Sequence, residues 1–402
     1  MGRAPVNIAP AGGRALLHSR VLATALFVCL CAFTLSTGDG NVIPGFVISA
    51  AVLALAAVCF WPGVFERIDF PLPAVILAAM TIYGIVQTLF FPHKIVYNGW
   101  TGVLFWLTAA VITLLSAQFF RSMGEGARFR LLFIVFGTLV CLLDLLQQAS
   151  QTTRYFWLIP SRYDVIFGPF AYWNNFAQFV ELLLPVTLWR ALGAGRADIR
   201  FVLCAAIQIG AVVASGSRAG TALIAIELFV LIAFAYAKNR SKTLLAGAGI
   251  AVALSVVFVY AAGFESLIAK LQQNDQLAVR RNIDRSSLAM IRTHPFAGWG
   301  LDTYVPVYRM FARYDDGTYV NRAHNDWLEW ASDGGIFFSG AMLAVFAWSI
   351  RPAIRSGWGI GLIAVCLHAL VDYPFARFGV CGWYFCLLGM LAARRKAIVR
   401  AL

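Results

Sequence analysis

The sequence predicts an all-α polytopic membrane protein, with about twelve transmembrane helices and one long, partly helical periplasmic loop between spans nine and ten. Of the 402 residues, 60% are hydrophobic and 13% are charged, whereas soluble domains are nearer half apolar and a quarter charged. Apolar runs of about 20 residues, the length that crosses a bilayer, recur along the chain. The short alternating segments that a membrane-spanning barrel needs are not visible.

Each predicted transmembrane helix is an apolar run bounded by polar or charged residues. The twelve runs are residues 21–37, 43–62, 70–91, 100–120, 131–149, 173–193, 200–216, 218–237, 244–263, 326–350, 356–372 and 378–395. They predict a single integral membrane domain over residues 1–402. Residues 264–325 interrupt the apolar pattern with eight Lys or Arg and six Asp or Glu. We interpret this segment as an ordered loop subdomain.

The charges of the connecting segments predict the orientation of the helices. The N-terminus and the connections on its side, as far as Arg394-Arg395-Lys396, are plainly more basic than the connections on the opposite side. By the positive-inside rule both termini are cytoplasmic and the long loop is external, which in a Gram-negative inner membrane means periplasmic. We therefore interpret the net charge of +13 as topology signals and lipid-headgroup contacts, and not as nucleic-acid binding.

Disulfide, zinc and secretory signals are weak. All eight Cys lie in apolar segments without a CxxC pair, so neither a disulfide framework nor a zinc site is expected. The only adjacent acid pair outside the predicted spans, Asp315-Asp316, lies beside a Gly and suits a turn. The basic N-terminus imitates a signal peptide, but residues 36–40 are a poor cleavage site, so we expect an uncleaved first helix.

The turn at Ser217-Arg218, between spans seven and eight, is the first candidate site. Ser217 can cap the following helix, whose N-terminus presents free N–H groups and a partial positive charge. With Arg218 added, such a helix end is suited to bind phosphate. The alternative is an interfacial Arg that snorkels beside small residues that allow tight helix packing.

The Arg280-Arg281 pair in the long loop is the second candidate. Apolar spacing over residues 276–293 predicts a helix, and the Pro and Gly residues of 294–300 end it. An Arg pair on a helix that faces the membrane could bind a diphosphate through paired hydrogen bonds. The residues alone favour a plainer alternative, a solvated helix face on which the arginines pair with Asp284.

His324 is the candidate base, because it lies just before the predicted tenth span. Asn325 or Asp326 would cap that span, with Glu329 completing a capping pattern from Asp326. The positive potential of a helix N-terminus favours a neutral imidazole, which can accept a proton from a hydroxyl nucleophile. Alternatively, His324 only orients the loop.

Polar residues at the start of span six could bind sugar hydroxyls. Asn174 leads a group that continues with Gln178 and Glu181, and these may equally be helix caps or interhelical hydrogen bonds. Three further acids within predicted spans receive only a structural polar role: Asp144, Glu227 and Asp372.

At these positions the sequence resembles the O-antigen ligase and polymerase superfamily of bacterial polysaccharide assembly. Five blocks between residues 168 and 372 match the family pattern in order. They are Gly168-Pro169-Phe170 with Asn174 and Phe176-Ala177; Ser217-Arg218; Arg280 with His294-Pro295, Gly298 and Gly300; His324-Asn325 with Gly334-Gly335; and His368-Ala369-Leu370-Val371-Asp372. One departure is Asp284, where relatives often carry Trp, so either Arg280 or Arg281 fits the family's Arg.

The resemblance implies an inverting C-type membrane glycosyltransferase that needs neither a metal nor another cofactor. Its donor would be a glycan on undecaprenyl diphosphate, and its acceptor the lipid A-core, a growing glycan chain or a pilin-like protein. The expected catalytic residues are His324, Arg280 and Arg218, and the expected substrate-binding residues are Arg281, Asn174, Asn325 and Ser217. The two catalytic arginines would neutralise the leaving diphosphate.

Ligation to the lipid A-core is the leading hypothesis, and a polysaccharide polymerase or a protein O-oligosaccharyltransferase stays open because all three use the same donor. A lipid-linked glycan transporter is the rival from another class. Transporters often have repeated halves with broken helices near the midplane. Here the halves differ and the polar features gather at one membrane face, which favours an enzyme.

Overall fold

The computed structural model is mostly α-helical, as the apolar runs predict. It describes residues 13–36, 38, 42–61, 64–65, 68–91, 95–121, 123–192, 197–239, 276–312 and 319–401, with short fragments between 246 and 260. In this part of the chain the strands form one two-stranded antiparallel sheet, in which β1 (Arg154–Tyr155) pairs with β2 (Ile159–Pro160). Everything that positions the candidate site is therefore helix or turn.

Nine apolar helices make the described chain a polytopic membrane protein. Five are long and apolar enough to cross a membrane: α3 (Leu72–Phe90), α4 (Val96–Phe119), α5 (Met123–Ala149), α8 (Arg218–Asn239) and α13 (Asp326–Ser356). Four have shorter apolar stretches: α1 (Gly13–Leu35), α2 (Ile43–Cys59), α7 (Ile199–Ala214) and α15 (Phe378–Ala401). The number of spans, twelve, stays a prediction.

The predicted eleventh span, 356–372, is shorter in the structure than in the sequence pattern. Its helix, α14, comprises only Ile360–His368. At about 1.5 Å per residue, α14 is too short to cross a bilayer alone. An apolar run measures composition, and it does not distinguish a helix from the turns that follow it here. Much of the predicted ninth span, 244–263, and the beginning of the long loop lie outside the described residues.

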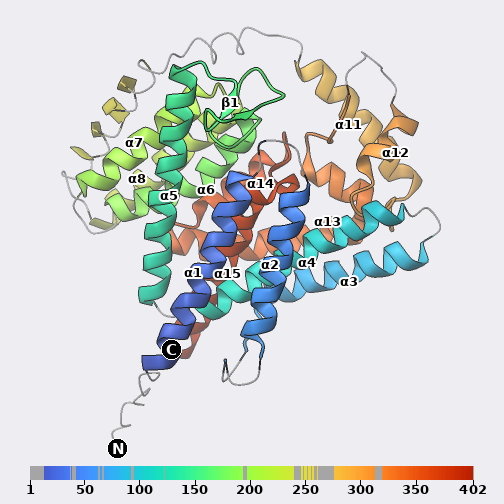
Figure 1. The fold of residues 1–402 in the computed structure, drawn as a ribbon, viewed down its shortest axis with the longest axis horizontal. Helices are drawn as coiled ribbons and strands as arrows, with labels where there is room; N and C mark the ends of the chain where they lie inside the picture. Colours follow the sequence, from blue (N-terminus) through green and yellow to red (C-terminus); the bar gives the residue numbers. More distant parts are fainter. Residues whose placement is uncertain are drawn as a thin grey trace, which may run out of the picture.

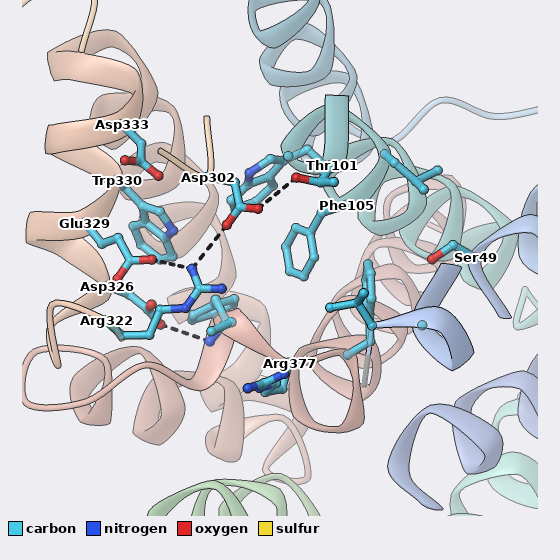
Figure 2. A pocket seen from close by; sticks show the side chains of 18 of the residues that line it. Ser49, Thr101, Phe105, Asp302, Arg322, Asp326, Glu329, Trp330, Asp333 and Arg377 are labelled. Carbon is cyan, nitrogen blue, oxygen red and sulfur yellow. Dashed lines mark hydrogen bonds and ion pairs between the residues drawn. The ribbon is translucent and has the colours of Figure 1, made fainter. Parts of the chain in front are cut away.

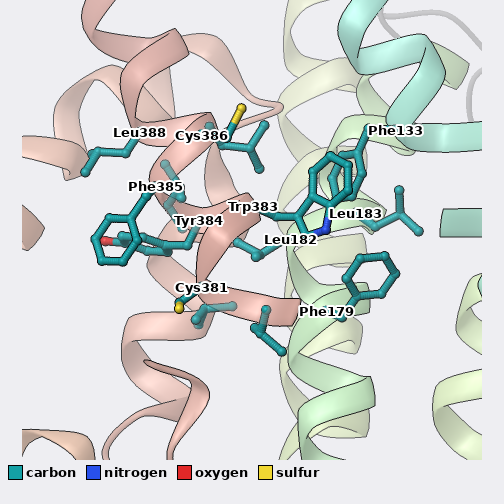
Figure 3. Packing of buried hydrophobic residues seen from close by; sticks show 14 of the residues in the cluster. Phe133, Phe179, Leu182, Leu183, Cys381, Trp383, Tyr384, Phe385, Cys386 and Leu388 are labelled. Carbon is teal, nitrogen blue, oxygen red and sulfur yellow. The ribbon is translucent and has the colours of Figure 1, made fainter. Parts of the chain in front are cut away.

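α6 (Trp173–Leu192) and α15 form the centre of the helix bundle, and nearly every residue of α6 is buried. Trp383 of α15 stacks on Phe133 of α5 with ring centroids 4.2 Å apart, and it meets Phe179 of α6 edge-on (Figure 3). The start of α1 and the end of α15 lie at one end of the bundle, and α11 (Gln276–Thr293) lies near the other (Figure 1). This aromatic core fixes α6, whose first turn carries Asn174.

α13 is interrupted at Gly335, which has a φ of +68°. The turn that follows α11 docks at this break through its backbone. The N–H of Trp299 donates to the carbonyl of Ser332 at 2.9 Å, and the N–H of Gly300 donates to that of Asp333 at 2.9 Å. The predicted tenth span is thus two helical pieces, and the break between them supplies carbonyl groups that a continuous helix would have used internally.

Gly298 and Gln87 complete this docking. Gly298 has a φ of +68°, and a Cβ added there would lie 2.3 Å from the carbonyl oxygen of Asp333, so only glycine fits. Nε2 of Gln87, on α3, donates to the carbonyls of Ala297 at 2.6 Å and Asp333 at 2.7 Å. These contacts explain why Pro and Gly residues end α11 at this position, and they fix the C-terminal end of α11 against the bundle.

The described part of the long loop has its own small apolar core. The predicted helix at residues 276–293 is confirmed as α11, and a second helix, α12 (Tyr304–Phe311), packs against it. The core consists of Ile283, Met290, Tyr304, Val307, Tyr308 and Ala323. The hydroxyl of Ser287 lies 2.7 Å from that of Tyr304 within this core. The described loop is therefore a packed structure that can hold Arg280 in one place.

Candidate active site

Asp372 is the centre of a polar cluster that draws on distant parts of the chain. Its fully buried carboxylate accepts hydrogen bonds from Nδ2 of Asn174 and, at 2.9 Å, from the backbone N–H of Tyr373. Nδ1 of His324 lies 3.5 Å from one carboxylate oxygen, and Nη2 of Arg280 lies 3.9 Å from the other. Two of the three predicted catalytic side chains therefore meet at one carboxylate.

The turn after α14 places Asp372 in the cluster. α14 ends at His368, whose Nδ1 lies 2.6 Å from Oε1 of Glu181 on α6, and both side chains are fully buried. The chain then turns through residues 369–372 and meets the start of α13, where the N–H of Asp326 donates to the carbonyl of Asp372 at 3.2 Å. α6, α13 and α14 thus hold the carboxylate together.

His324 and Arg280 are held by the cluster and still reachable. Their side chains are 23% and 27% exposed, whereas the Asp372 side chain is 0% exposed. His324 has a φ of +51°, a left-handed conformation that is uncommon for a residue other than glycine. Such local strain is often found where the surrounding structure fixes a functional side chain.

The electrostatics favour an anionic Asp372. Burial acts to raise its pKa, but the neighbouring imidazoles of His324 and His368 and the guanidinium of Arg280 lower the pKa below its ordinary value. The carboxylate is therefore ionised at neutral pH. It can orient the imidazole and stabilise the imidazolium that forms when His324 takes up a proton.

Two tyrosines enclose the cluster. The rings of Tyr172 and Tyr373 stack with centroids 5.7 Å apart, and the ring of His324 meets Tyr373 edge-on at 4.9 Å. Burial, followed by the charge of Asp372, raises the pKa of Tyr172. Tyr172 therefore remains a neutral phenol, and its hydroxyl accepts from Nδ2 of Asn174 at 3.2 Å.

Ser217 connects the start of α8 to the same cluster. Its hydroxyl donates to Oδ1 of Asn174 at 2.7 Å and accepts from the N–H of Gly220 at 3.1 Å, so the predicted helix cap is confirmed. A Cβ on Gly220 would lie 2.4 Å from the Cβ of Ala177 on α6, and this close approach brings the two helices together. Arg218 follows Ser217 as the first residue of α8.

Arg281 and Asn325 lie beside the cluster without a contact to Asp372 among the described residues. Arg281 is exposed on α11, whereas its neighbour Arg280 reaches Asp372. Arg280 makes no ion pair with Asp284 in the described part of the chain, so the plainer pairing predicted for it is not observed.

Asn325 uses its side chain to cap α13, accepting from the N–H of Leu328 at 3.2 Å. The alternative cap, Asp326, was wrong: its carboxylate accepts from the N–H of Phe375 at 2.9 Å. Glu329 does not complete a capping pair with Asp326 either, because it accepts from the N–H of Ala323 at 3.0 Å and binds Arg322. The predicted helix start is right, but Asp326 binds the backbone at Phe375 and Glu329 binds the segment before the helix.

Sequence reasoning missed Asp372 and Tyr172 as parts of the site. Asp372 was grouped with Asp144 and Glu227 as a buried structural acid, because an isolated acid in an apolar run gives no sign of its neighbours. The available signal was the last block of the family pattern, which ends at Asp372. Tyr172 was one of several aromatic residues before α6, and only its contacts distinguish it.

Comparison with known proteins adds a family to this geometry. Residues 203–338 match the family model described as O-antigen ligase. The match extends from α7 to the middle of α13 and includes Ser217, Arg218, Arg280 and His324. A search of curated proteins finds no match.

Proposed function

We propose, since the chain belongs to the O-antigen ligase superfamily of membrane glycosyltransferases, that it transfers a glycan from undecaprenyl diphosphate to a hydroxyl group of the lipid A-core. The observation that supports this most is the meeting of His324 and Arg280 at the Asp372 carboxylate. We propose that this cluster faces the periplasm and that the reaction needs no metal.

The proposed reaction is a single displacement that inverts the sugar carbon. The acceptor oxygen attacks C1 of the sugar next to the diphosphate, and a new C1–O bond forms. The C1–O bond to the diphosphate breaks, and its electron pair stays on the diphosphate oxygen. The proton of the acceptor hydroxyl passes to His324.

We infer different tasks for the two ring nitrogens of His324. Nδ1 faces Asp372 at 3.5 Å, so the tautomer that suits the reaction carries its proton there. Nε2 is then the atom that takes the acceptor proton. Asp372 fixes the ring direction and compensates the positive charge that appears on it.

Arg280 and Arg218 supply the positive charge that the leaving diphosphate needs. Arg280 lies at the Asp372 carboxylate, and Arg218 begins α8 directly after Ser217, which is linked through Asn174 to the same carboxylate. The N-terminus of α8 adds backbone N–H groups and its dipole. The Tyr172 hydroxyl accepts from Nδ2 of Asn174 in the same cluster.

The test is glycan transfer by purified protein in detergent, with a lipid-linked glycan as donor and lipid A-core as acceptor. We expect His324→Ala to lower the transfer rate by roughly 10²- to 10⁴-fold, which is the usual rate enhancement from a general base. His324→Ala with an unchanged thermal midpoint and an undiminished rate would remove His324 from the mechanism. When the donor is incubated without lipid A-core, its glycan should not be lengthened. A lengthened glycan would identify a polymerase and overturn the proposed acceptor.

A further inference from the structure

A cavity of about 200 Å³ lies beside the Asp372 cluster, between α2, α4, the start of α13 and the short helix η1 (Pro374–Ala376). We name it the α2–α4 cavity. Figure 2 shows Arg322, Glu329 and Trp330 on one wall and Phe105 and Ser49 across from them. Its aromatic lining consists of Phe46, Phe105, Trp106, Trp330, Phe375 and Phe378.

The segment that carries the candidate base also lines this cavity. Arg322 and Asp326 line it, and His324, midway between them in the sequence, lies 3.5 Å from Asp372. A molecule in the cavity is therefore adjacent to the proposed reaction centre without occupying the Arg280 and Arg218 site.

Most charged groups of the cavity already have partners. Nη1 of Arg322 lies 2.7 Å from Oε1 of Glu329 and 3.4 Å from Oδ1 of Asp302. The other oxygen of Asp302 accepts from the hydroxyl of Thr101 at 2.8 Å. The carboxylate of Asp326 is used by a backbone N–H. Arg322 thus pairs with two of these three carboxyl groups, and together the four side chains define the polar wall.

Arg377 is different, because among the described residues no carboxylate lies within ion-pair distance of its guanidinium. It lines the cavity and is partly buried (Figure 2). Burial and the positive charge of Arg322 lower the pKa of Arg377 below its ordinary value. A guanidinium against apolar walls and near a second guanidinium is stabilised by an anion that forms paired hydrogen bonds with it.

Asp333 provides the complementary observation. It lines the same cavity, it is only 6% exposed, and its Oδ1 has no hydrogen-bond partner among the described residues. A buried carboxyl oxygen without a donor is costly. A hydroxyl group in the cavity would supply that donor.

We propose that the α2–α4 cavity binds a sugar residue that carries a phosphate or carboxylate group, with Arg377 as the counter-ion, Asp333 as a hydroxyl acceptor and the aromatic lining against the sugar ring. Aromatic faces, a guanidinium with no carboxylate partner in the described part of the chain and a buried hydroxyl acceptor together suit an anionic sugar better than a neutral sugar or a lipid chain. Assigning this sugar to the acceptor substrate rests on the proposed function; binding of the sugar itself does not.

The test is titration of the purified protein, in a neutral detergent, with glucose 6-phosphate, glucuronate, glucose and inorganic phosphate. Intrinsic fluorescence can report binding because Trp106 and Trp330 line the cavity. We expect Arg377→Gln to weaken glucose 6-phosphate binding roughly tenfold or more, the loss of a charge-assisted pair. Arg377→Lys should restore part of it. Arg355→Gln, at an exposed position in the last turn of α13, is the matched control and should bind like the wild type.

Equal binding by wild type and Arg377→Gln would overturn the proposal, as would glucose binding as tightly as glucose 6-phosphate. Inorganic phosphate binding as tightly as glucose 6-phosphate would overturn the sugar part. Loss of binding in Arg280→Gln, with Arg377→Gln unaffected, would place the anion at the other site and also overturn it. The transfer assay is independent: an active His324→Ala enzyme would refute the proposed function while leaving cavity binding intact.

Discussion

Replacing Asp372 with Asn tests the reasoning about the active site most directly. Asn has nearly the same shape, so the buried turn keeps its packing and the Tyr373 N–H can keep its acceptor. The change removes the negative charge that faces His324 at 3.5 Å and Arg280 at 3.9 Å. We expect the imidazolium formed during transfer to lose its nearest compensating charge.

The size of the effect follows from the distance. Two unit charges 3.5 Å apart attract by about 5 kcal/mol at an effective dielectric constant of about 20. Since about 1.4 kcal/mol is tenfold in rate, complete loss of this attraction corresponds to roughly 10³-fold slower transfer. This is an upper value, because the partly exposed His324 is also stabilised by water.

The assay is single-turnover transfer from lipid-linked donor, with Asp144→Asn as the matched control. Asp144 is also a fully buried acid, and its carboxylate bonds to Gln148 away from the cluster. We expect Asp372→Asn to be slowed by more than about tenfold and Asp144→Asn to transfer normally. Asp372→Asn that folds and transfers within threefold of the wild type, roughly 0.7 kcal/mol, would refute the role assigned to the carboxylate.

The pH dependence of thermal stability gives a second test of the Asp372→Asn variant. Because the pKa of Asp372 in the folded protein is lower than the ordinary 3.8, its ionised form stabilises the fold above pH 3.8. That stability is lost as pH falls through the lowered pKa. The thermal midpoint of Asp372→Asn should therefore lie below that of the wild type at pH 7, and the difference should shrink only below pH 3.8.

Two further predictions, each with a control variant, concern Arg280 and the turn that follows α11. Arg280→Gln should lower transfer at least about tenfold more than Arg281→Gln, because only Arg280 reaches the Asp372 carboxylate; equal rates in a side-by-side assay would contradict the assignment. Gly298→Ala should lower stability by more than about 2 kcal/mol, through the positive φ and the 2.3 Å approach to a carbonyl oxygen. Gly340→Ala, in α13 with nothing within 4 Å of the added Cβ, should be neutral or stabilising in the same thermal scan.

The local features of the fold could be read from the sequence, since periodicity and terminal signals are local. The helix at residues 276–293, its end at the Pro and Gly turn, and the caps at Ser217 and Asn325 all appear as predicted. The length of the apolar runs was less informative about the helices. By this criterion residues 356–372 are one span, although the helix there is only α14. Run length also cannot show the break of α13 at Gly335, because that break depends on the loop that docks there.

The site could be predicted only in part, because its centre is a tertiary contact. His324 and Arg280 were identified by residue type and family pattern, but what joins them is Asp372, which looks in the sequence like any buried acid. Its role appears only when the turn after α14 is folded against α6 and α13. The cavity behind Arg322 gave no sequence signal either, since its walls come from helices far apart in the chain.

The way the turn after α11 docks into the break of α13 has a consequence for how such a protein can diversify. The contacts are mostly backbone to backbone, joined by the Gln87 and Tyr83 side chains from α3, and they need glycine where the chains touch, at Gly298 and Gly335. Among the described residues, the exposed positions of α11 and α12 take no part in these backbone contacts. Those positions can change while Arg280 stays in register with the Asp372 carboxylate.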